Sequence, residues 1–324
     1  MHVFITGATG FIGGKLTAKL LKAGHRITAL VRDPSKAEDL KALGAALIEG
    51  NVTDKESMRR GMRSADGLFH LAAWYKVGVN ARDLAYRINV QGTRNVLELM
   101  NELGVPRGVY TSTLAVFSDT RGEMVDESYR FEGEHLSAYD ETKWIAHYEV
   151  ARPMMEAGLP LTVVQPGLVY GPGDTSTLED NLRLYLKGRL PMMPKQTAFC
   201  WSHVDDIVDA HILALEKGKP REDYIIAGPP HTFIEAMEIA EKITGVRPPR
   251  LRIGPGMLKC TAKLMKPVNA LFPLPPTYTP EGLRVVAGVT YLGDNSKAKR
   301  ELGYAPRSLE HGLQETLEHL MKEM

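Results

Sequence analysis

Two side chains four residues apart, Tyr139 and Lys143, have the spacing of an acid–base pair. Residues at positions i and i+4 lie on one face of a helix, with Cβ atoms about 5–6 Å apart, and we expect a helix to begin near Ala138. A lysine in that place stabilises a tyrosinate and lowers the pKa of the phenol. The phenol could then act as a general acid or base near neutral pH. A surface Tyr–Lys pair would show the same spacing.

A hydroxyl group, that of Thr113, accompanies this pair. Thr113 ends the run 110–113 at the tip of an expected strand. The carboxyl ends of parallel strands carry the chemistry of open α/β sheets, so the hydroxyl can hydrogen-bond a substrate carbonyl beside Tyr139. A turn residue is the alternative interpretation of Thr113 alone.

A glycine-rich turn at residues 6–13 follows a short apolar strand and opens a helix, as a dinucleotide-binding turn requires. Gly7 permits the tight turn, Gly10 lets the backbone approach a pyrophosphate, and Gly13 lets the helix pack close to the sheet. The helix N-terminus supplies free N–H groups to the phosphates. The predicted contacts in the turn are Gly7, Thr9, Gly10, Phe11, Ile12 and Gly13.

Arg32 stands at the tip of the next strand, where a protein distinguishes NADP from NAD. An arginine there suits the 2′-phosphate of NADP, whereas an acidic residue accepts the ribose hydroxyl of NAD. Arg32, with Lys36 nearby, favours NADP(H), and Asp33 keeps NAD open. Asn51, beside Val52 after the third strand, is a candidate adenine contact or else a cap or turn residue.

The elements that position these groups alternate between helix and strand. We expect strands at 26–31, 46–48, 67–71, 108–111 and 161–164, and helices at 15–23, 34–43 and 84–103. Strands that are apolar on both faces indicate a doubly wound parallel sheet of the Rossmann α/β class. Residues 1–165 are the predicted nucleotide-binding domain, with a return segment near 196–228. Residues 166–324, which are rich in proline, are mainly the smaller substrate-binding domain.

Composition excludes several other classes of protein. The net charge of +1 gives no reason to expect a nucleic-acid partner. The two cysteines, Cys200 and Cys260, form no metal-binding or disulfide pattern, so we predict no metal and a reduced, cytoplasmic protein. No apolar run approaches the ~20 residues that span a bilayer, and we recognise no signal peptide.

In this order the motifs resemble the extended short-chain dehydrogenase/reductase family, also called the NAD-dependent epimerase/dehydratase family. The resemblance rests on 6–13, 70–73, 89–93, 111–113, Tyr139 with Lys143, 166–172, 203–206 and 297–306. It implies that Tyr139 is the acid/base, that Lys143 binds the nicotinamide ribose and that Thr113 contacts the carbonyl. It also implies a homodimer and cofactor contacts at Leu71, Ala72, Ala73, Asn89, Thr111, Pro166 and Val169.

Three positions depart from the family pattern. Thr113 replaces the usual serine, Asn51 the usual aspartate, and Gln165 the arginine that often precedes the proline. Residues 31–34 look most like the dihydroflavonol-reductase branch, which uses NADPH. We therefore predict an NADP(H)-dependent reductase of a small or medium apolar carbonyl compound. The alternatives are a nucleotide-sugar epimerase that uses NAD and a regulator that binds NADP without catalysis.

Other features have structural interpretations beside functional ones. Trp74, Tyr75 and Phe117 could form an apolar substrate wall or pack between domains. We expect His70 and His203 to pack in the interior, and Asp205 to cap a helix that starts near Ile207. The basic amphipathic stretch 257–266 is predicted to be a mobile cap over the substrate, with contact to a membrane surface as the alternative.

Overall fold

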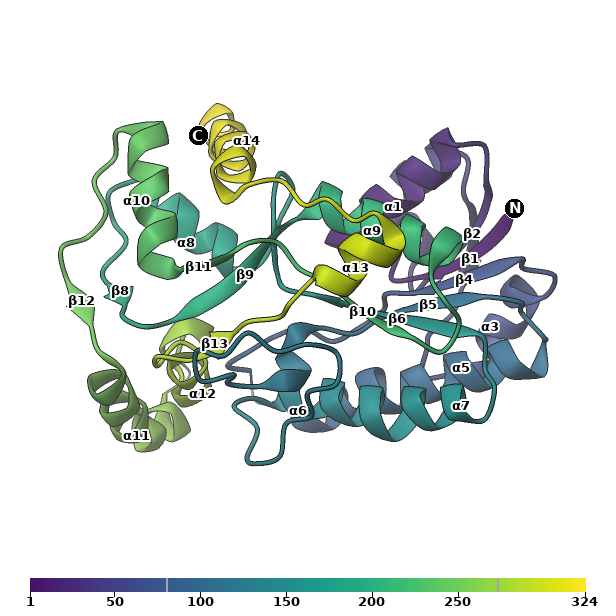
Figure 1. Ribbon diagram of the computed structural model, residues 1–324, viewed down its shortest axis with the longest axis horizontal. Coiled ribbons are helices and arrows are strands. Elements are labelled where there is room, and N and C mark those ends of the chain that lie inside the picture. Colours follow the sequence, from purple (N-terminus) through teal and green to yellow (C-terminus); the bar gives the residue numbers. More distant parts are fainter. Residues whose placement is uncertain (80, 273) are drawn as a thin grey trace.

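A parallel seven-stranded sheet in the order β10-β6-β5-β4-β1-β2-β3 forms the centre of the computed structural model (Figure 1). The structure describes residues 1–79, 81–272 and 274–324. The sheet strands are β1 (His2–Thr6), β2 (Arg26–Val31), β3 (Ala46–Glu49), β4 (Gly67–His70), β5 (Gly108–Thr111), β6 (Leu161–Pro166) and β10 (Asp223–Ile226). The predicted doubly wound α/β class is confirmed.

Helices cover both faces of this sheet, so its central strands are buried on both sides. One face packs against α1 (Phe11–Lys22), α9 (Val204–Lys217) and α13 (Ser296–Leu302). The other packs against α3 (Lys55–Met62), α5 (Gly92–Glu102), α6 (Ala138–Ile145) and α7 (Arg152–Glu156). Strands β1 and β4 are neighbours, and the chain order reverses there. Such a switch point leaves a crevice at the carboxyl ends of the strands, where ligands bind.

Local capping explains where the helices differ from the predicted ones. The helix expected at 15–23 begins at Phe11, since Gly10 is already its N-cap. The helix expected at 34–43 is split into η1 (Pro34–Lys36) and α2 (Glu38–Ala42), because Asp33 caps a separate 3₁₀ turn. The unpredicted helix α3 starts after Asp54, whose carboxylate accepts the N–H groups of Glu56 and Ser57.

Two π-helical segments interrupt the long helices on the α5–α6 face. The first, η2 (Arg87–Gln91), joins α4 (Arg82–Tyr86) to α5, and the second, η4 (Ala146–Ala151), joins α6 to α7. The two segments lie against each other. Such segments are frequent at functional sites, and here they carry Asn89 and His147, which support the candidate site described below.

A second sheet is built around β9 (Ala198–His203), which pairs with β7 (Leu168–Tyr170), β11 (Pro230–Thr232) and β13 (Thr290–Tyr291). Its core includes residues of α8 (Thr177–Leu186), α10 (Phe233–Thr244) and α14 (Leu309–Lys322). The short strands β8 (Met193–Pro194) and β12 (Arg252–Ile253) lead to a cap of α11 (Pro255–Leu271), η5 (Pro276–Tyr278) and α12 (Pro280–Arg284). Within the described ranges, no helix has the length and hydrophobicity needed to cross a bilayer.

Candidate functional site

Thr113 and Tyr139 meet at the carboxyl end of β5. Thr113 is the N-cap of the 3₁₀ helix η3 (Leu114–Phe117), and its Oγ1 accepts the N–H of Ala115 at 3.1 Å. Tyr139 lies in the first turn of α6, which Ser137 starts by accepting the N–H of Asp140 at 3.1 Å. The caps of η3 and α6 therefore fix both side chains at the tip of the strand.

The environment of Tyr139 keeps its phenol protonated. Burial raises the pKa of Tyr139 well above its usual value, and the hydroxyl of Thr113 partly offsets this rise. The ring of Tyr75 stands edge-on to the Tyr139 ring, with centroids 4.8 Å apart. Tyr75 itself is 54% exposed. The arrangement supplies a proton donor with a hydrogen-bonding neighbour and an accessible aromatic side chain beside it.

Lys143 follows one turn later on α6, but its contacts differ from those expected. Its Nζ donates to the hydroxyl of Tyr110 at 2.9 Å and to the carbonyl oxygen of Thr111 at 2.8 Å. Among the hydrogen bonds of the described residues, none joins Lys143 to Tyr139. Burial lowers the pKa of Lys143 to about 7. Its ammonium group is therefore easily deprotonated and is held at the floor of the site by β5.

A buried clamp holds η4 and α7 against the sheet. His147 Nδ1 lies 2.8 Å from the hydroxyl of Ser112, and its Nε2 lies 3.1 Å from the carboxylate of Asp223 on β10. Arg152 pairs with the same carboxylate at 2.8 Å. Ser112, His147 and Asp223 are at most 3% exposed, so this serine has no access to a substrate. The clamp positions the neighbours of Thr113 and Lys143.

The glycine turn has the shape that a pyrophosphate needs. Gly7 has a positive φ of 78°, and a Cβ there would lie 2.6 Å from the amide nitrogen of Ala72. A Cβ at Gly13 would lie 2.1 Å from the carbonyl oxygen of Gly7. The first turn of α1 holds no acidic residue, and both Thr9 and Gly10 are exposed. The helix N-terminus is therefore open to an anion, and the residues present fit a dinucleotide.

Polar side chains under the turn tie β1, β4 and α5 together. His70, as expected, is buried, and its nitrogens lie 2.8 Å from Thr6 Oγ1 and 3.0 Å from Thr93 Oγ1. Thr6 Oγ1 also accepts the N–H of Ala72 at 3.3 Å. Burial, with a smaller contribution from Lys143, lowers the pKa of His70 to about 3. A neutral imidazole therefore holds the backbone of β4 against the glycine turn.

Asn89 supports the cofactor groove through the backbone. Its Oδ1 accepts the N–H of Trp74 at 2.7 Å, and its Nδ2 donates to the Trp74 carbonyl at 3.1 Å and to Thr142 at 3.0 Å. The amide therefore fixes the segment after β4 against α6. Other predicted contacts in the described chain are partly buried at Phe11, Ile12, Leu71, Ala72, Thr111 and Val169, buried at Val52 and Pro166, and exposed at Ala73.

At the tip of β2, Asp33 and Arg32 have different roles. The Asp33 carboxylate accepts from the N–H and hydroxyl of Ser35, at 3.1 and 2.6 Å, and lies 3.6 Å from Lys36. The Ser35 hydrogen bonds hold the pKa of Asp33 below its usual value. Arg32 is exposed and has no ion-pair or hydrogen-bond partner in the part of the chain that the structure describes. Asn51 forms a turn, since its Oδ1 accepts the N–H of Thr53 at 3.1 Å.

The remaining aromatic residues and one predicted cap have structural roles. Trp74 and Phe117 are buried, which leaves Tyr75 as the exposed member of that trio. The prediction that Asp205 caps α9 is wrong. The N-cap lies two residues earlier than expected: the helix starts at Val204, and the ring of His203 accepts the N–H of Asp205 at 3.3 Å.

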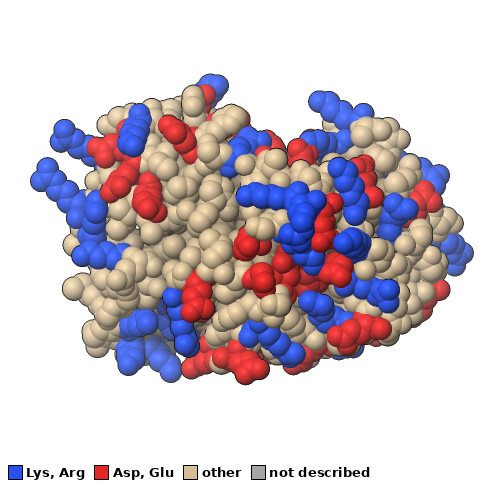
Figure 2. All heavy atoms as spheres, viewed as in Figure 1, with Lys and Arg blue, Asp and Glu red and all other residues tan. Residues whose placement is uncertain are grey.

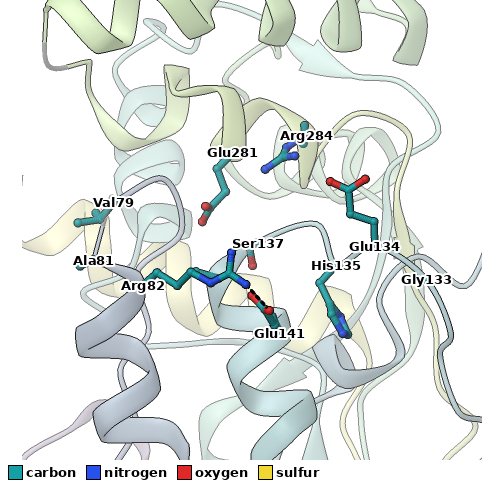
Figure 3. Close-up of a pocket in the computed structure, with 11 residues that line it drawn as sticks. Val79, Ala81, Arg82, Gly133, Glu134, His135, Ser137, Glu141, Glu281 and Arg284 are labelled. Atoms are coloured by element: carbon teal, nitrogen blue, oxygen red, sulfur yellow. Dashed lines mark hydrogen bonds and ion pairs between the residues drawn. The ribbon is translucent and has the colours of Figure 1, made fainter.

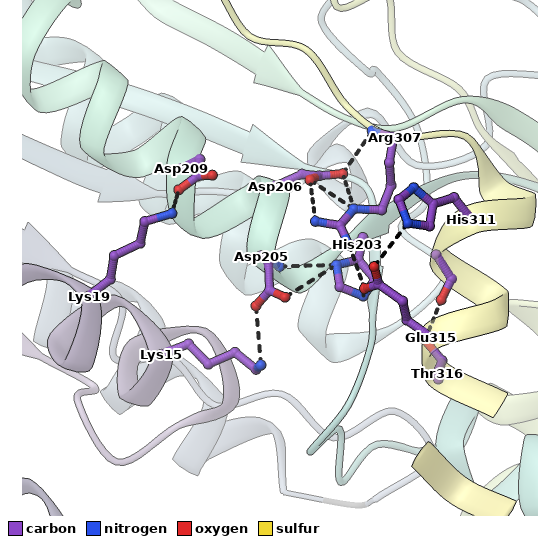
Figure 4. Close-up of polar contacts among 11 residues, drawn as sticks. Lys15, Lys19, His203, Asp205, Asp206, Asp209, Arg307, His311, Glu315 and Thr316 are labelled. Carbon is purple, nitrogen blue, oxygen red and sulfur yellow. Dashed lines mark hydrogen bonds and ion pairs between the residues drawn. The ribbon is translucent and has the colours of Figure 1, made fainter. Parts of the chain in front are cut away.

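An ion-pair network joins α1, α9 and α14 (Figure 4). Lys15 pairs with Asp205 at 3.1 Å, and Arg307 pairs with Asp206 at 2.9 Å and with Glu315 at 2.5 Å. Ligand atoms of His203, Asp205 and Glu315 lie within 4.8 Å of one another. Lysine and arginine already neutralise both carboxylates, so the cluster fastens helices together instead of offering free metal ligands.

A cavity of about 410 Å³ lies beside the first turn of α6, between the sheet domain and the cap (Figure 3). Its lining includes Glu134, Glu141 and Glu281 together with Arg82 and Arg284. Arg82 forms an ion pair with Glu141. Glu281 of α12 accepts the N–H of Gly78 at 3.0 Å, which joins the cap to the segment that follows Tyr75.

Sequence reasoning missed Tyr110 and His147 as parts of the site. The alternation of β5 could have indicated Tyr110, because residues two apart on a strand face the same side. Tyr110 and Ser112 face the helices that carry Lys143 and His147, whereas the Thr111 hydroxyl faces His211 of α9 at 2.8 Å. The partners of His147 come from distant strands, and no local pattern marks them.

Comparison with known proteins identifies the family. The profile described as NAD dependent epimerase/dehydratase family matches residues 3–227. A dihydroflavonol 4-reductase-like protein of Synechocystis is 32% identical over 96% of this chain and 92% of its own length. The 4-hydroxy-2-methyl-3-oxo-4-farnesyl-3,4-dihydroquinoline-1-oxide ketoreductase of Stigmatella aurantiaca is 30% identical over 95% of this chain and 92% of its own.

A solved structure agrees over the full length. The crystal structure of gox2253 superimposes with a TM-score of 0.85 at 30% identity, covering 99% of this chain and 98% of that one. The family uses a nicotinamide cofactor, and the shape of the glycine turn fits the pyrophosphate of such a group. The chain belongs to the NAD-dependent epimerase/dehydratase family, as an NAD(P)-dependent oxidoreductase or epimerase of the extended short-chain dehydrogenase type.

Proposed function

We propose that the protein is an NADP(H)-dependent reductase that acts on a carbonyl group of a small or medium apolar molecule. The observation that carries this proposal is the meeting of Thr113 and Tyr139 at the end of β5. The two hydroxyl groups lie at the same edge of the sheet as the glycine turn, because β5, β4 and β1 are neighbouring parallel strands whose carboxyl ends meet at that edge. A carbonyl carbon held there would lie at the nicotinamide end of the crevice.

The chemistry follows from the protonation states of the side chains. A bound nicotinamide cofactor supplies the hydride. Tyr139, whose raised pKa keeps it protonated, delivers a proton to the carbonyl oxygen, and Thr113 orients that oxygen by a hydrogen bond. Proton transfer leaves a tyrosinate, and the Lys143 amine, one turn further on α6, stabilises that anion when the amine is charged.

NADP(H) is favoured over NAD(H) by the tip of β2. Arg32 is exposed and unpaired in the described chain, so its guanidinium is free for a 2′-phosphate. Ser35 donates two hydrogen bonds to one carboxylate oxygen of Asp33, and the other oxygen lies 3.6 Å from Lys36, so both oxygens already have partners within the turn.

An apolar substrate is favoured over a nucleotide sugar by the lining of the site. Tyr75 presents an exposed aromatic ring beside Tyr139. The adjoining cavity contains three carboxylates against two guanidinium groups, one of which is already paired, and such a lining repels a diphosphate. The relatives named as a dihydroflavonol reductase-like protein and a farnesyl-dihydroquinoline ketoreductase support the same choice.

The test is turnover of a carbonyl panel with NADPH by the native chain and by Tyr139→Phe. The variant keeps the ring that contacts Tyr75, so we expect unchanged NADPH affinity and a loss of turnover of about 10²–10⁴-fold. Thr113→Val should slow turnover, and Thr113→Ser should restore it. Undiminished turnover by Tyr139→Phe would overturn the assignment. Sugar epimerisation without net NADPH oxidation, or cofactor binding without turnover on any panel member, would favour the two alternative functions.

A further inference from the structure

The segment that leads into the cap and carries α11 and η5 has a charge composition unlike the rest of the chain. Residues 246–280 contain six basic residues and no acidic one. The remainder of the chain has 34 basic and 39 acidic residues, so it is weakly acidic. The basic residues of the segment are Arg247, Arg250, Arg252, Lys259, Lys263 and Lys266, and all six are exposed.

Large apolar side chains are exposed in the same segment. Of the sixteen large hydrophobic residues exposed in the described chain, seven lie between residues 251 and 278, namely Leu251, Met257, Leu264, Val268, Leu271, Phe272 and Tyr278. Leu264, Leu271 and Phe272 are 65%, 77% and 67% exposed. Exposed apolar patches of this kind mark sites that contact another molecule or a membrane.

The helix α11 arranges these residues in two stripes. Met257, Leu264, Val268 and Leu271 recur at helical spacing and share one side. Lys259, Lys263 and Lys266 share another side, while Leu258 and Ala262, only 2% and 4% exposed, face the body of the cap. The helix therefore presents an apolar edge and a basic edge to solvent. At the lower left of Figure 2, where α11 lies, the surface is mainly tan and blue.

We infer that the cap docks through α11 on the surface of an anionic phospholipid bilayer. Apolar side chains would enter the boundary between headgroups and acyl chains, and lysine stems are long enough to reach the phosphates beside them. Charge complementarity selects this occupant. Arg252 pairs with Glu238 of α10 at 3.1 Å, and the other five cations of a segment without anions are attracted to a negative lipid surface. The helix lies on the bilayer and does not cross it.

This position connects the lipid surface to the catalytic site. Glu281 of α12, which packs on α11, holds the backbone of Gly78, three residues beyond Tyr75. A bilayer under α11 would thus lie next to the segment that approaches Tyr139. If the proposed reductase function holds, an apolar carbonyl compound dissolved in the bilayer can enter from the lipid. Docking itself does not depend on that function.

The experiment is co-sedimentation of the full-length protein with vesicles of phosphatidylcholine alone and of phosphatidylcholine with phosphatidylglycerol. We expect binding to the anionic vesicles that weakens as salt rises. The triple variant Lys259→Gln/Lys263→Gln/Lys266→Gln should bind about fivefold more weakly for each lysine removed, or roughly 100-fold in all. Leu264→Gln/Leu271→Gln should also reduce binding. NADPH affinity, measured in parallel, should stay unchanged in every variant.

Matched controls are Lys22→Gln/Lys187→Gln/Lys322→Gln and Leu43→Gln, which change exposed residues outside the cap. They should bind vesicles like the native chain. Three results would overturn the inference: no binding to anionic vesicles, equal losses in the controls, or a concentration-dependent dimer in light scattering that Leu264→Gln/Leu271→Gln dissolves. Vesicle binding by a native chain that turns over no carbonyl compound with NADPH would count against the proposed function and leave the docking inference standing.

Discussion

Replacement of Arg32 by alanine tests how the cofactor is selected. The guanidinium is exposed and has no partner in the described chain, so its removal leaves no buried group unsatisfied and should leave stability unchanged. A hydrogen bond to a charged group contributes about 1.5–3 kcal/mol, which corresponds to roughly 10–150-fold in affinity. We expect Arg32→Ala to weaken NADPH binding by that factor in a fluorescence titration and to leave NADH binding unchanged.

The control for this variant is Arg26→Ala, an exposed arginine at the opposite end of the same strand. It should bind both cofactors like the native chain, since it lies away from the carboxyl edge of the sheet. The interaction is ionic, so the difference between native protein and Arg32→Ala should shrink at high salt. Equal losses of NADH and NADPH affinity in Arg32→Ala, or no loss of either, would contradict this role of Arg32.

Three further predictions concern the supports of the site. Tyr110→Phe removes a hydroxyl that accepts a hydrogen bond from the Lys143 ammonium group at 2.9 Å, so the pKa of Lys143 should fall. The limb of the pH–rate profile that reports the charged amine should then move to lower pH, and a limb at its native position would contradict this role of Tyr110. Gly13→Ala places a Cβ 2.1 Å from the Gly7 carbonyl oxygen, so it should lower the free energy of unfolding in urea by about 1–3 kcal/mol and weaken cofactor binding. In Gly14→Ala the nearest atom to the new Cβ is 3.6 Å away, so both stability and cofactor affinity should stay unchanged. Burial raises the pKa of Asp140 from 3.8 to about 7, so its contribution to the free energy of unfolding should fall as pH rises through that range, and Asp140→Asn should flatten this dependence in denaturation curves.

The sequence pattern predicted the turn and the strands that position the site, because these elements depend on local chemistry. Glycines that permit a turn, strands buried on both faces and the order of motifs placed Tyr139 and Thr113 on one edge of a parallel sheet. The spacing of Tyr139 and Lys143 gave a shared helix face, as expected. It could not show that Lys143 reaches down to Tyr110, because the side chain beneath a helix is chosen by the sheet and not by the helix sequence.

Residues that are brought together over long distances escaped prediction for the same reason. His147 meets Ser112 and Asp223 only after β5, β10 and η4 have assembled. The N-cap of α9 was predicted wrongly for a local reason. Histidine is an uncommon N-cap residue, and Asp205, two residues after His203, fits the usual preference better. The exposed face of α11 needed the structure as well, because an amphipathic pattern does not say which apolar residues the body covers.

The ion pairs among α1, α9 and α14 have a consequence for how the chain folds during translation. Helix α1 carries the glycine turn near the N-terminus, yet it is braced by α9, and α9 is braced in turn by Arg307 near the C-terminus. Strand β10 likewise joins β6 only after the whole intervening segment has been made. The seven-stranded sheet and its helices therefore complete their packing when translation is nearly finished, and a chain truncated before Arg307 should have its first helix incompletely anchored.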